Sequence, residues 1–333
     1  MEREPYQLLE TEWAKAQTLR PEGMVACNSG TAALHLALEA LRLPEGSGVI
    51  LPDYTMVACA NAVVMAGLEP IFCDCRRDSL LIDTTKLDSL MNGDVRAIMA
   101  VHVYGRQCDM QSIHAFADTY GLNVIEDLAE AHSVRPHWRT DVSCWSFYKN
   151  KVVHGEEGGA AYFKNVMDAR VARQLRSVGF TEAHDYTHIP RGHNYRLANL
   201  LAEPIRESIH QMGYNLAERR RVEALFEAEC PNQWKQPHRD CPWVYDIRIP
   251  GMNHTTQTEL VRRLNSLGFT ARHGFKPMTD QQQYRFMTHK MLTVESHKAS
   301  SEVVYLNLTP DWQNPHDEMS ANLLFKEIKK VAG

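Results

Sequence analysis

The chain lacks several features that would have assigned it to a class directly. No apolar stretch approaches the roughly 18 residues that span a bilayer, and residues 1–6 have no apolar core typical of an export signal. A formal net charge of -5 gives no general electrostatic reason to bind nucleic acid or an anionic membrane. No Gly-x-Ser-x-Gly, Walker or Gly-x-Gly-x-x-Gly motif is present, which argues against a serine hydrolase, an NTPase and a dinucleotide-binding protein.

Paired metal-binding or redox motifs are also missing. The 8 cysteines include no Cys-x-x-Cys pair and lie mostly within apolar runs, as small buried residues do. We therefore expect a reduced, cytoplasmic setting. The segment 184–188 contains His184, Asp185 and His188, which are metal-ligating residue types, but no second cluster pairs with it in the sequence. We expect no metal site there.

What the sequence does contain is an alternation of strand-like and helix-like segments. With 333 residues and 44% apolar content, the chain can build one large and one smaller domain. Short apolar runs alternate with helical patterns, which predicts an α/β domain with a mostly parallel sheet and helices on both faces. The predicted strands are 24–27, 48–52, 70–73, 96–103 and 122–127, and the predicted helices are 30–43, 57–66, 84–91 and 110–120.

The pattern changes after residue 200. Residues 200–229 are helical and charged, and the run 218–223 is typical of a solvated helix face whose arginines pair with neighbouring glutamates. A strand at 243–249, a helix at 256–267 and a strand at 303–308 then predict a small α+β domain. We expect a large domain over 1–215 and a small one over 216–333.

Three short segments carry the candidate chemistry. Ser29, Gly30 and Thr31 open the first long helix, where free N–H groups and the helix dipole bind phosphate, although Asn28 or Ser29 could simply cap that helix. Asp127 ends a strand, where its carboxylate would face the ligand crevice of such a sheet or cap a helix at 129–131.

The third segment, 146–151, supplies an amine. It follows an apolar stretch and precedes Gly158 and Gly159, so Lys151 is predicted in a loop between two strands. Burial readily lowers the pKa of a lysine enough for it to attack an aldehyde. Lys149 is an alternative, because alternation along an extended segment places both lysines on the same side. An amine, a carboxylate and a phosphate-binding helix end together are the parts of a pyridoxal phosphate (PLP) site.

These segments together resemble one family. The chain is similar to the DegT/DnrJ/EryC1/StrS sugar aminotransferases from about residue 8 to residue 312, on motifs that are specific in combination: residues 28–38, 125–127, 146–151 and 192–197. The resemblance implies the aspartate aminotransferase-like fold, that is, the PLP-dependent transferase fold type I. It also implies a homodimer whose active sites lie at the subunit interface.

The resemblance implies roles for individual residues. Lys151, which follows Asn150 as the family's lysine follows an asparagine, would form the Schiff base with PLP and carry the proton during transfer, and Asp127 would pair with the pyridine nitrogen. The other expected cofactor contacts are Glu130 near the 3-hydroxyl, Ser29, Gly30, Thr31 and Ser146 around the phosphate, and Asn194 reaching the phosphate from the partner subunit.

The sequence also departs from the family pattern. Met56 stands where the family usually has an aromatic residue stacked on the cofactor ring, and it is a softer and more flexible platform. The family's Thr-Gly-Glu-Gly-Gly becomes Gly155-Glu156-Glu157-Gly158-Gly159 in this sequence, which adds the carboxylate of Glu156 beside the site. The chain also begins later than the family pattern, without the segment that helps to enclose the substrate.

We expect a PLP-dependent aminotransferase that moves an amino group from an amino acid to a keto sugar linked to a nucleotide. Glutamate is the expected amino donor. Arg196, Arg272 and Lys276 are the candidate substrate contacts. Two alternatives stay open at this stage. One is another PLP reaction, elimination or decarboxylation, on a modified nucleotide or its attached amine; the other is a catalytically silent dimer, against which the presence of both Lys151 and Asp127 counts.

Overall fold

A seven-stranded sheet forms the centre of the larger part of the molecule. The computed structural model describes residues 4–181, 185–285, 293–308 and 318–332. The strand order is β1-β7-β6-β5-β4-β2-β3, and β7 is antiparallel to both of its neighbours while the other pairs are parallel. The mostly parallel, mixed sheet is thus confirmed. Its strands are β1 (Met24–Cys27), β2 (Gly48–Pro52), β3 (Glu69–Cys73), β4 (Val95–Val101), β5 (Asn123–Asp127), β6 (Val142–Ser146) and β7 (Gly159–Phe163).

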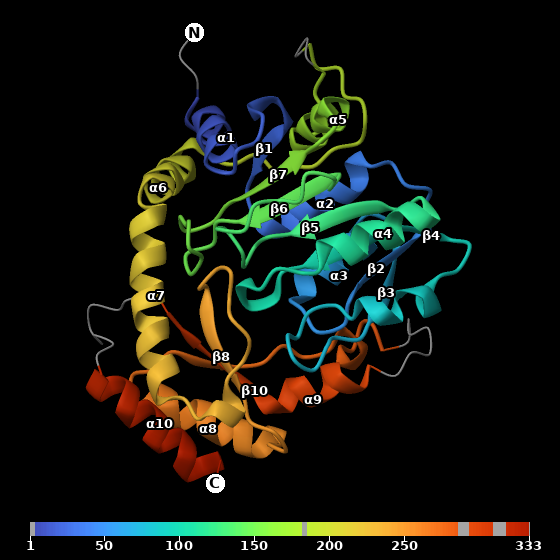
Figure 1. Cartoon of the computed structure of the whole chain (residues 1–333). Helices are drawn as coiled ribbons and strands as arrows, with labels where there is room; N and C mark the ends of the chain where they lie inside the picture. Colours follow the sequence, from blue (N-terminus) through green and yellow to red (C-terminus); the bar gives the residue numbers. More distant parts are fainter. Residues whose placement is uncertain (1–3, 182–184, 286–292, 309–317, 333) are drawn as a thin grey trace.

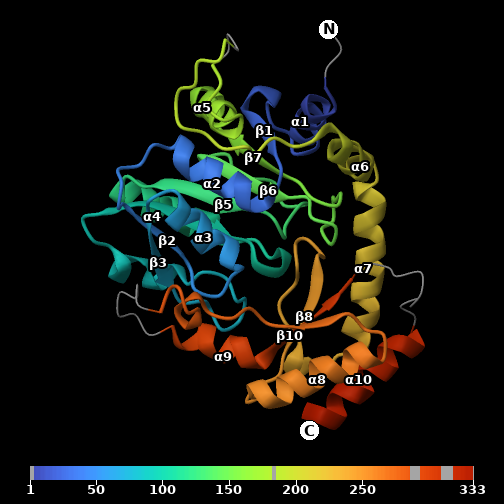
Figure 2. The ribbon, with the colours of Figure 1, turned by 180° about the vertical axis from the view of Figure 1, so that it is seen from behind.

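Helices cover both faces of this sheet, as expected. Figures 1 and 2 show α2 (Gly30–Ala40) and α3 (Val57–Met65) against one face and α4 (Met110–Tyr120) against the other. Residues 84–91 do not form the predicted α-helix, because Thr84–Leu90 is a 3-10 helix. Asp83 caps its first turn, and the β-branched Thr84 and Thr85 are poor α-helix formers.

A second apolar cluster lies between the sheet and two helices at the top of Figure 1, α1 (Pro5–Ala16) and α6 (Asn199–His210). Trp13 of α1 is fully buried and packs edge-on against Trp145 and Phe147, with ring centroids 5.7 and 5.3 Å away. This aromatic cluster anchors the end of β6 and the beginning of the loop that carries Lys151. A further helix, α5 (Val166–Arg176), packs beside α2, β1 and β7.

The smaller part of the molecule is built on an antiparallel sheet of order β8-β10-β9. Figure 1 shows the long helix α7 running from the level of the large sheet to the small one. The bounds are α7 (Met212–Glu229), β8 (Val244–Arg248), α8 (His254–Ser266), β9 (Ala271–His273), α9 (Val294–Glu302), β10 (Val303–Asn307) and α10 (Glu318–Ala332). Short 3-10 helices lie at Pro21–Gly23, Val103–Gly105, Asn232–Trp234 and Met278–Asp280.

The prediction that residues 218–223 form a solvated helix face is only partly right for α7. Arg220 and Arg221 pair with Glu223 and Glu218, as expected of a solvated face. Arg219 is instead buried, because it faces the junction between the two sheets. The expected boundary at residues 215 and 216 falls within this same helix. Across the four described ranges, no helix is both long and apolar enough to cross a membrane.

Candidate active site

A cavity of about 530 Å³ opens between the two sheets, at the carboxyl ends of β4, β5 and β6. Ligands of parallel sheets bind at this edge. Nine of the residues predicted from the sequence line this cavity: Ser29, Gly30, Thr31, Met56, Asp127, Glu130, Ser146, Lys151 and Arg272. Arg272 and Tyr305 of the small sheet line the opposite side, together with Trp243, which directly precedes β8.

The N-terminus of α2 reaches the cavity because two glycines remove side chains from its path. A Cβ on Gly30 would lie 2.7 Å from Ser146 Cβ, and a Cβ on Gly159 would lie 2.3 Å from the carbonyl oxygen of Ser29. Ser29 Oγ also accepts a hydrogen bond from the Ala32 N–H at 3.1 Å. Ser29 therefore caps the helix, and the same helix end lines the cavity, so the two interpretations of this segment hold together.

Asp127 is buried at the end of β5 with its carboxylate fixed by two donors. The Ala129 N–H donates to Oδ1 at 2.9 Å, and the Cys59 thiol donates to Oδ2 at 3.2 Å. Residues 129–131 form a turn and not a helix, so the predicted alternative of a helix cap was wrong. A carboxylate held in one orientation at the cavity wall is suited to bind a protonated ring nitrogen.

Lys151 is the lysine that faces the cavity. It is 9% exposed, whereas Lys149 is exposed to solvent. The expectation that both lysines share one side was wrong, because residues 149–153 follow turns and bends and not an extended strand. The Lys151 Nζ atom lies 3.8 Å from the ring centroid of Trp243, which places the amine on the face of the indole.

Arg219 holds the backbone around Lys151. Its guanidinium donates to the carbonyl oxygens of Asn150, Lys151 and Trp243, at 3.2, 3.1 and 2.7 Å. The indole N–H of Trp243 donates to the Asn150 carbonyl at 3.1 Å. These bonds tie the lysine loop to α7 and to the segment before β8, so the position of the amine depends on both parts of the molecule.

Burial also tunes the charges in the cavity. Desolvation lowers the pKa of Lys151, and the nearby Arg219 guanidinium lowers it further, although Glu130 and Asp127 oppose the shift. Desolvation raises the pKa of Glu130 to about 7, and Lys151 and the Tyr104 N–H, which donates to Glu130 at 2.7 Å, limit that rise. Both effects favour the uncharged amine, which is the nucleophilic form.

Three predicted residues do not line the cavity of their own chain. Asn194 and Arg196 are exposed, and the Asn194 side chain accepts from Arg196 at 3.4 Å. Lys276 is also exposed. His184 lies outside the described residues, so the segment 184–188 is not placed as a whole.

Sequence reasoning missed four residues that shape the site: Tyr104, Arg219, Trp243 and Tyr305. Tyr104 stacks on Phe275 with ring centroids 5.1 Å apart, which continues the aromatic wall. Nothing in the sequence marked these residues. They come from four separate segments of the chain and meet only after the two sheets pack together.

The residues of the cavity fit PLP. A helix N-terminus cleared by two glycines suits a phosphate, the fixed Asp127 carboxylate suits a pyridine nitrogen, and the buried Lys151 amine suits an aldehyde. Few other cofactors combine an anionic group, a basic ring nitrogen and a carbonyl.

Comparison with known proteins agrees with this geometry. Residues 7–320 match the DegT/DnrJ/EryC1/StrS aminotransferase family, and the chain belongs to that family. It is 34% identical over 284 residues to a GDP-perosamine synthase of Caulobacter vibrioides, covering 81% of this chain and 76% of that protein. It is 28% identical over 320 residues to a GDP-perosamine synthase of Vibrio cholerae, covering 93% and 86%.

A solved structure confirms the fold. The putative sugar aminotransferase Spr1654 from Streptococcus pneumoniae, in its PMP form, superposes with a TM-score of 0.88 at 17% identity, covering 99% of this chain and 91% of that one. The fold is therefore that of the PLP-dependent transferases of type I, and the chain belongs to a family of PLP-dependent aminotransferases.

Proposed function

We propose that this enzyme transfers an amino group from an amino acid, with glutamate as the expected donor, to a keto sugar carried on a nucleotide. The observation that carries the proposal is the placement of the Lys151 amine in one cavity with the Asp127 carboxylate and the N-terminus of α2. The sugar substrate is supported by the relatives, since those from Caulobacter vibrioides and Vibrio cholerae are both named GDP-perosamine synthases.

The side chains divide the work as follows. When bound, PLP supplies an electron sink for the carbanion that forms at the amino carbon. Gly30, Thr31 and Ser146 would hold its phosphate, Asp127 would keep its ring nitrogen protonated, and Glu130 is the residue proposed beside its 3-hydroxyl. Lys151 would hold the cofactor through its amine and would carry the proton during transfer, for which the lowered pKa of that amine is suited.

Arg272 is the best-placed substrate residue. It lies on β9, lines the cavity from the small sheet, and brings a positive charge to the side opposite Asp127. A guanidinium there suits the carboxylate of the amino donor. Met56 is 51% exposed at the rim, where a flexible thioether can adapt to a ring. Glu157 adds a carboxylate to the same rim.

We further propose that the enzyme is a homodimer, with Asn194 and Arg196 completing the partner's site. Both side chains are exposed and lie outside their own cavity, which supports a role in the second subunit. Lys276 is proposed at the sugar end. We retain the domains as 1–215 and 216–333 and a cytoplasmic location as parts of this proposal.

The test uses the visible absorption of the purified protein with added PLP, in the native enzyme and in Lys151→Ala, with Lys149→Ala as the matched control. We expect the native enzyme and Lys149→Ala to show the visible band of lysine-bound PLP and to lose it on addition of glutamate. We expect no such band from Lys151→Ala.

Two results would overturn the proposal. A band that no amino acid removes would favour elimination or decarboxylation over amino transfer. The absence of any band in the native enzyme would favour a silent ligand-binding dimer. If the half-reaction is confirmed, turnover with a panel of nucleotide-linked keto sugars identifies the acceptor, and unchanged kinetics in Arg272→Ala would remove that residue from the site.

A further inference from the structure

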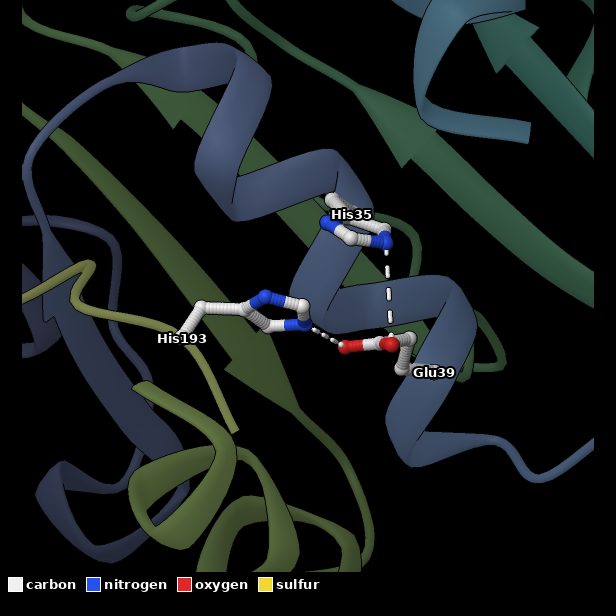
Figure 3. Close-up of side chains that lie close together, drawn as sticks. All are labelled: His35, Glu39 and His193. Carbon is white, nitrogen blue, oxygen red and sulfur yellow. Dashed lines mark hydrogen bonds and ion pairs between the residues drawn. The ribbon is translucent and has the colours of Figure 1, made fainter. Parts of the chain in front are cut away.

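A second cluster of chemically active side chains lies outside the cavity, on the outer part of α2. His35 and Glu39 are four residues apart on that helix and so share one face, and His193 approaches from the segment between α5 and α6. Figure 3 shows that both imidazole rings are directed at the Glu39 carboxylate, each towards one of its oxygens. One ligand atom from each of the three residues lies within 4.8 Å of the others.

The state of His35 points to a missing partner. The His35 side chain is 3% exposed, and its Nε2 atom has no hydrogen-bond partner among the described residues. Its other nitrogen, Nδ1, lies 3.1 Å from the Tyr195 hydroxyl. If Nδ1 carries the ring proton and donates it to Tyr195, the Nε2 lone pair is directed towards Glu39, whose Oε1 is 3.7 Å away.

A histidine with one ring nitrogen bonded to an oxygen and the other without a partner has the arrangement found in metal-binding histidines. A ligating imidazole almost always donates its second N–H to an oxygen, which fixes its tautomer and orientation. The backbone carbonyl of Met65 also lies beside this ring, which adds an oxygen to its surroundings.

Two of the distances in this cluster can be compared with those of a zinc site. With metal–ligand distances of about 2.0–2.1 Å, neighbouring atoms of a tetrahedral site lie about 3.4 Å apart. His35 Nε2 lies 3.7 Å from Glu39 Oε1, which is close to this value. His193 Nε2 instead lies 2.7 Å from the other carboxylate oxygen, Oε2, and this contact would have to open by about 0.7 Å for a metal to bind there. His193 is partly exposed, so its ring has room to move.

We propose that His35, Glu39 and His193 form a divalent transition-metal site, with zinc as the preferred ion and water or a carbonyl oxygen in the fourth position. Two histidines and one carboxylate suit zinc better than magnesium or calcium, which prefer oxygen ligands. The site is independent of the proposed function, since none of its ligands lines the cavity.

Such a site would act as a clip between two parts of the chain. It joins α2, whose N-terminus lines the cavity, to the segment that carries Asn194 and Arg196 directly after His193. The present contacts of this segment with α2 include the His193 to Glu39 bond and the His35 to Tyr195 contact. A bound ion would replace the first and strengthen the second.

The test is equilibrium dialysis of the holoenzyme against zinc chloride, with the bound metal counted by elemental mass spectrometry. We expect one zinc ion per chain with a dissociation constant in the micromolar range or below. Glu39→Gln and His35→Ala should each weaken binding at least tenfold. His188→Ala is the control, because His188 lies on the same segment, is exposed, and bonds the Val178 carbonyl at 2.9 Å.

A thermal readout keeps the proposal testable if a variant is poorly folded. Zinc should raise the melting temperature of the native enzyme and of His188→Ala, and should leave that of Glu39→Gln unchanged. The proposal fails if the native enzyme binds no zinc at 100 µM. It also fails if Glu39→Gln and His35→Ala bind the same amount as the native enzyme with the same affinity.

Discussion

The close approach of α2 to β6 predicts what one added methyl group will do. In Gly30→Ala the new Cβ would lie 2.7 Å from Ser146 Cβ and 3.1 Å from Ser146 Oγ. An ordinary contact is at least about 3.4 Å, so the helix end and Ser146 must separate by about 0.7 Å. Overpacking of this size lowers the free energy of unfolding by about 1–3 kcal/mol. The higher helix propensity of alanine offsets about 1 kcal/mol or less of this loss.

The larger effect should be on the cofactor. Separating Ser146 from the N-terminus of α2 widens the site proposed for the phosphate, where each hydrogen bond to a charged group contributes about 1.5–3 kcal/mol. Loss of one such bond weakens binding by about tenfold or more. We therefore expect Gly30→Ala to bind PLP at least about tenfold more weakly than the native enzyme, measured by titrating its visible absorption band.

Gly213→Ala is the matched control. Gly213 lies in α7, and a Cβ there would meet nothing within 4 Å. Alanine at that position should leave PLP affinity unchanged and stabilise the fold by up to about 1 kcal/mol. If Gly30→Ala binds PLP as tightly as Gly213→Ala and melts at the same temperature, the close approach does not shape the site and the reasoning is wrong.

Three further predictions concern groups behind the cavity. Arg219→Met removes the donor to three backbone carbonyls and should lower the free energy of unfolding, measured by chemical denaturation, by about 3 kcal/mol or more. Arg221→Met, at an exposed position of the same helix, should lower it by under about 0.5 kcal/mol. Equal losses in the two variants would refute the role of Arg219. Glu130 has a folded pKa of about 7, above its unfolded value, so between about pH 4.5 and 7 the folded state binds the extra proton and stability falls as pH rises. Glu130→Gln should remove this slope, at most about 1.4 kcal/mol per pH unit, and an unchanged pH profile of unfolding would contradict the shift. Cys59→Val removes the thiol that donates to Asp127 and should weaken PLP binding several-fold, whereas Cys59→Ser keeps a donor and should not; identical affinities would show that this bond does not matter.

The sequence predicted the parts of the fold that depend on local pattern. The strands at 24–27 and 48–52 and the helix at 110–120 agree with β1, β2 and α4, because continuous apolar runs and amphipathic periods are local properties. The cavity residues from Ser29 to Thr31, Asp127 and Lys151 also lie where their positions at strand and helix ends indicated.

What escaped prediction depends on contacts between distant segments. Arg219 sits in a charged run that is typical of a solvated helix face, and only the packing of α7 against the lysine loop buries it. Local pattern alone could not separate Lys149 from Lys151, and only the family resemblance favoured Lys151, because Arg219 and Trp243 bind the backbone of this loop from distant parts of the chain. The prediction of an α-helix at 84–91 was wrong because short-range hydrogen bonds to the Asp83 side chain favour a 3-10 turn.

The antiparallel strand β7 has a consequence for how the chain folds during synthesis. Among the described strands, β1 pairs with β7 alone, so Met24–Cys27 stay without that partner until Gly159–Phe163 have left the ribosome. Helix α1 stays without its packing partner α6 for longer still, because α6 begins at Asn199. At about 5–20 residues per second, the first strand remains exposed for roughly 7–30 seconds. An apolar segment held open for that time is where we expect a nascent-chain chaperone to bind, and where slowed translation would most increase aggregation.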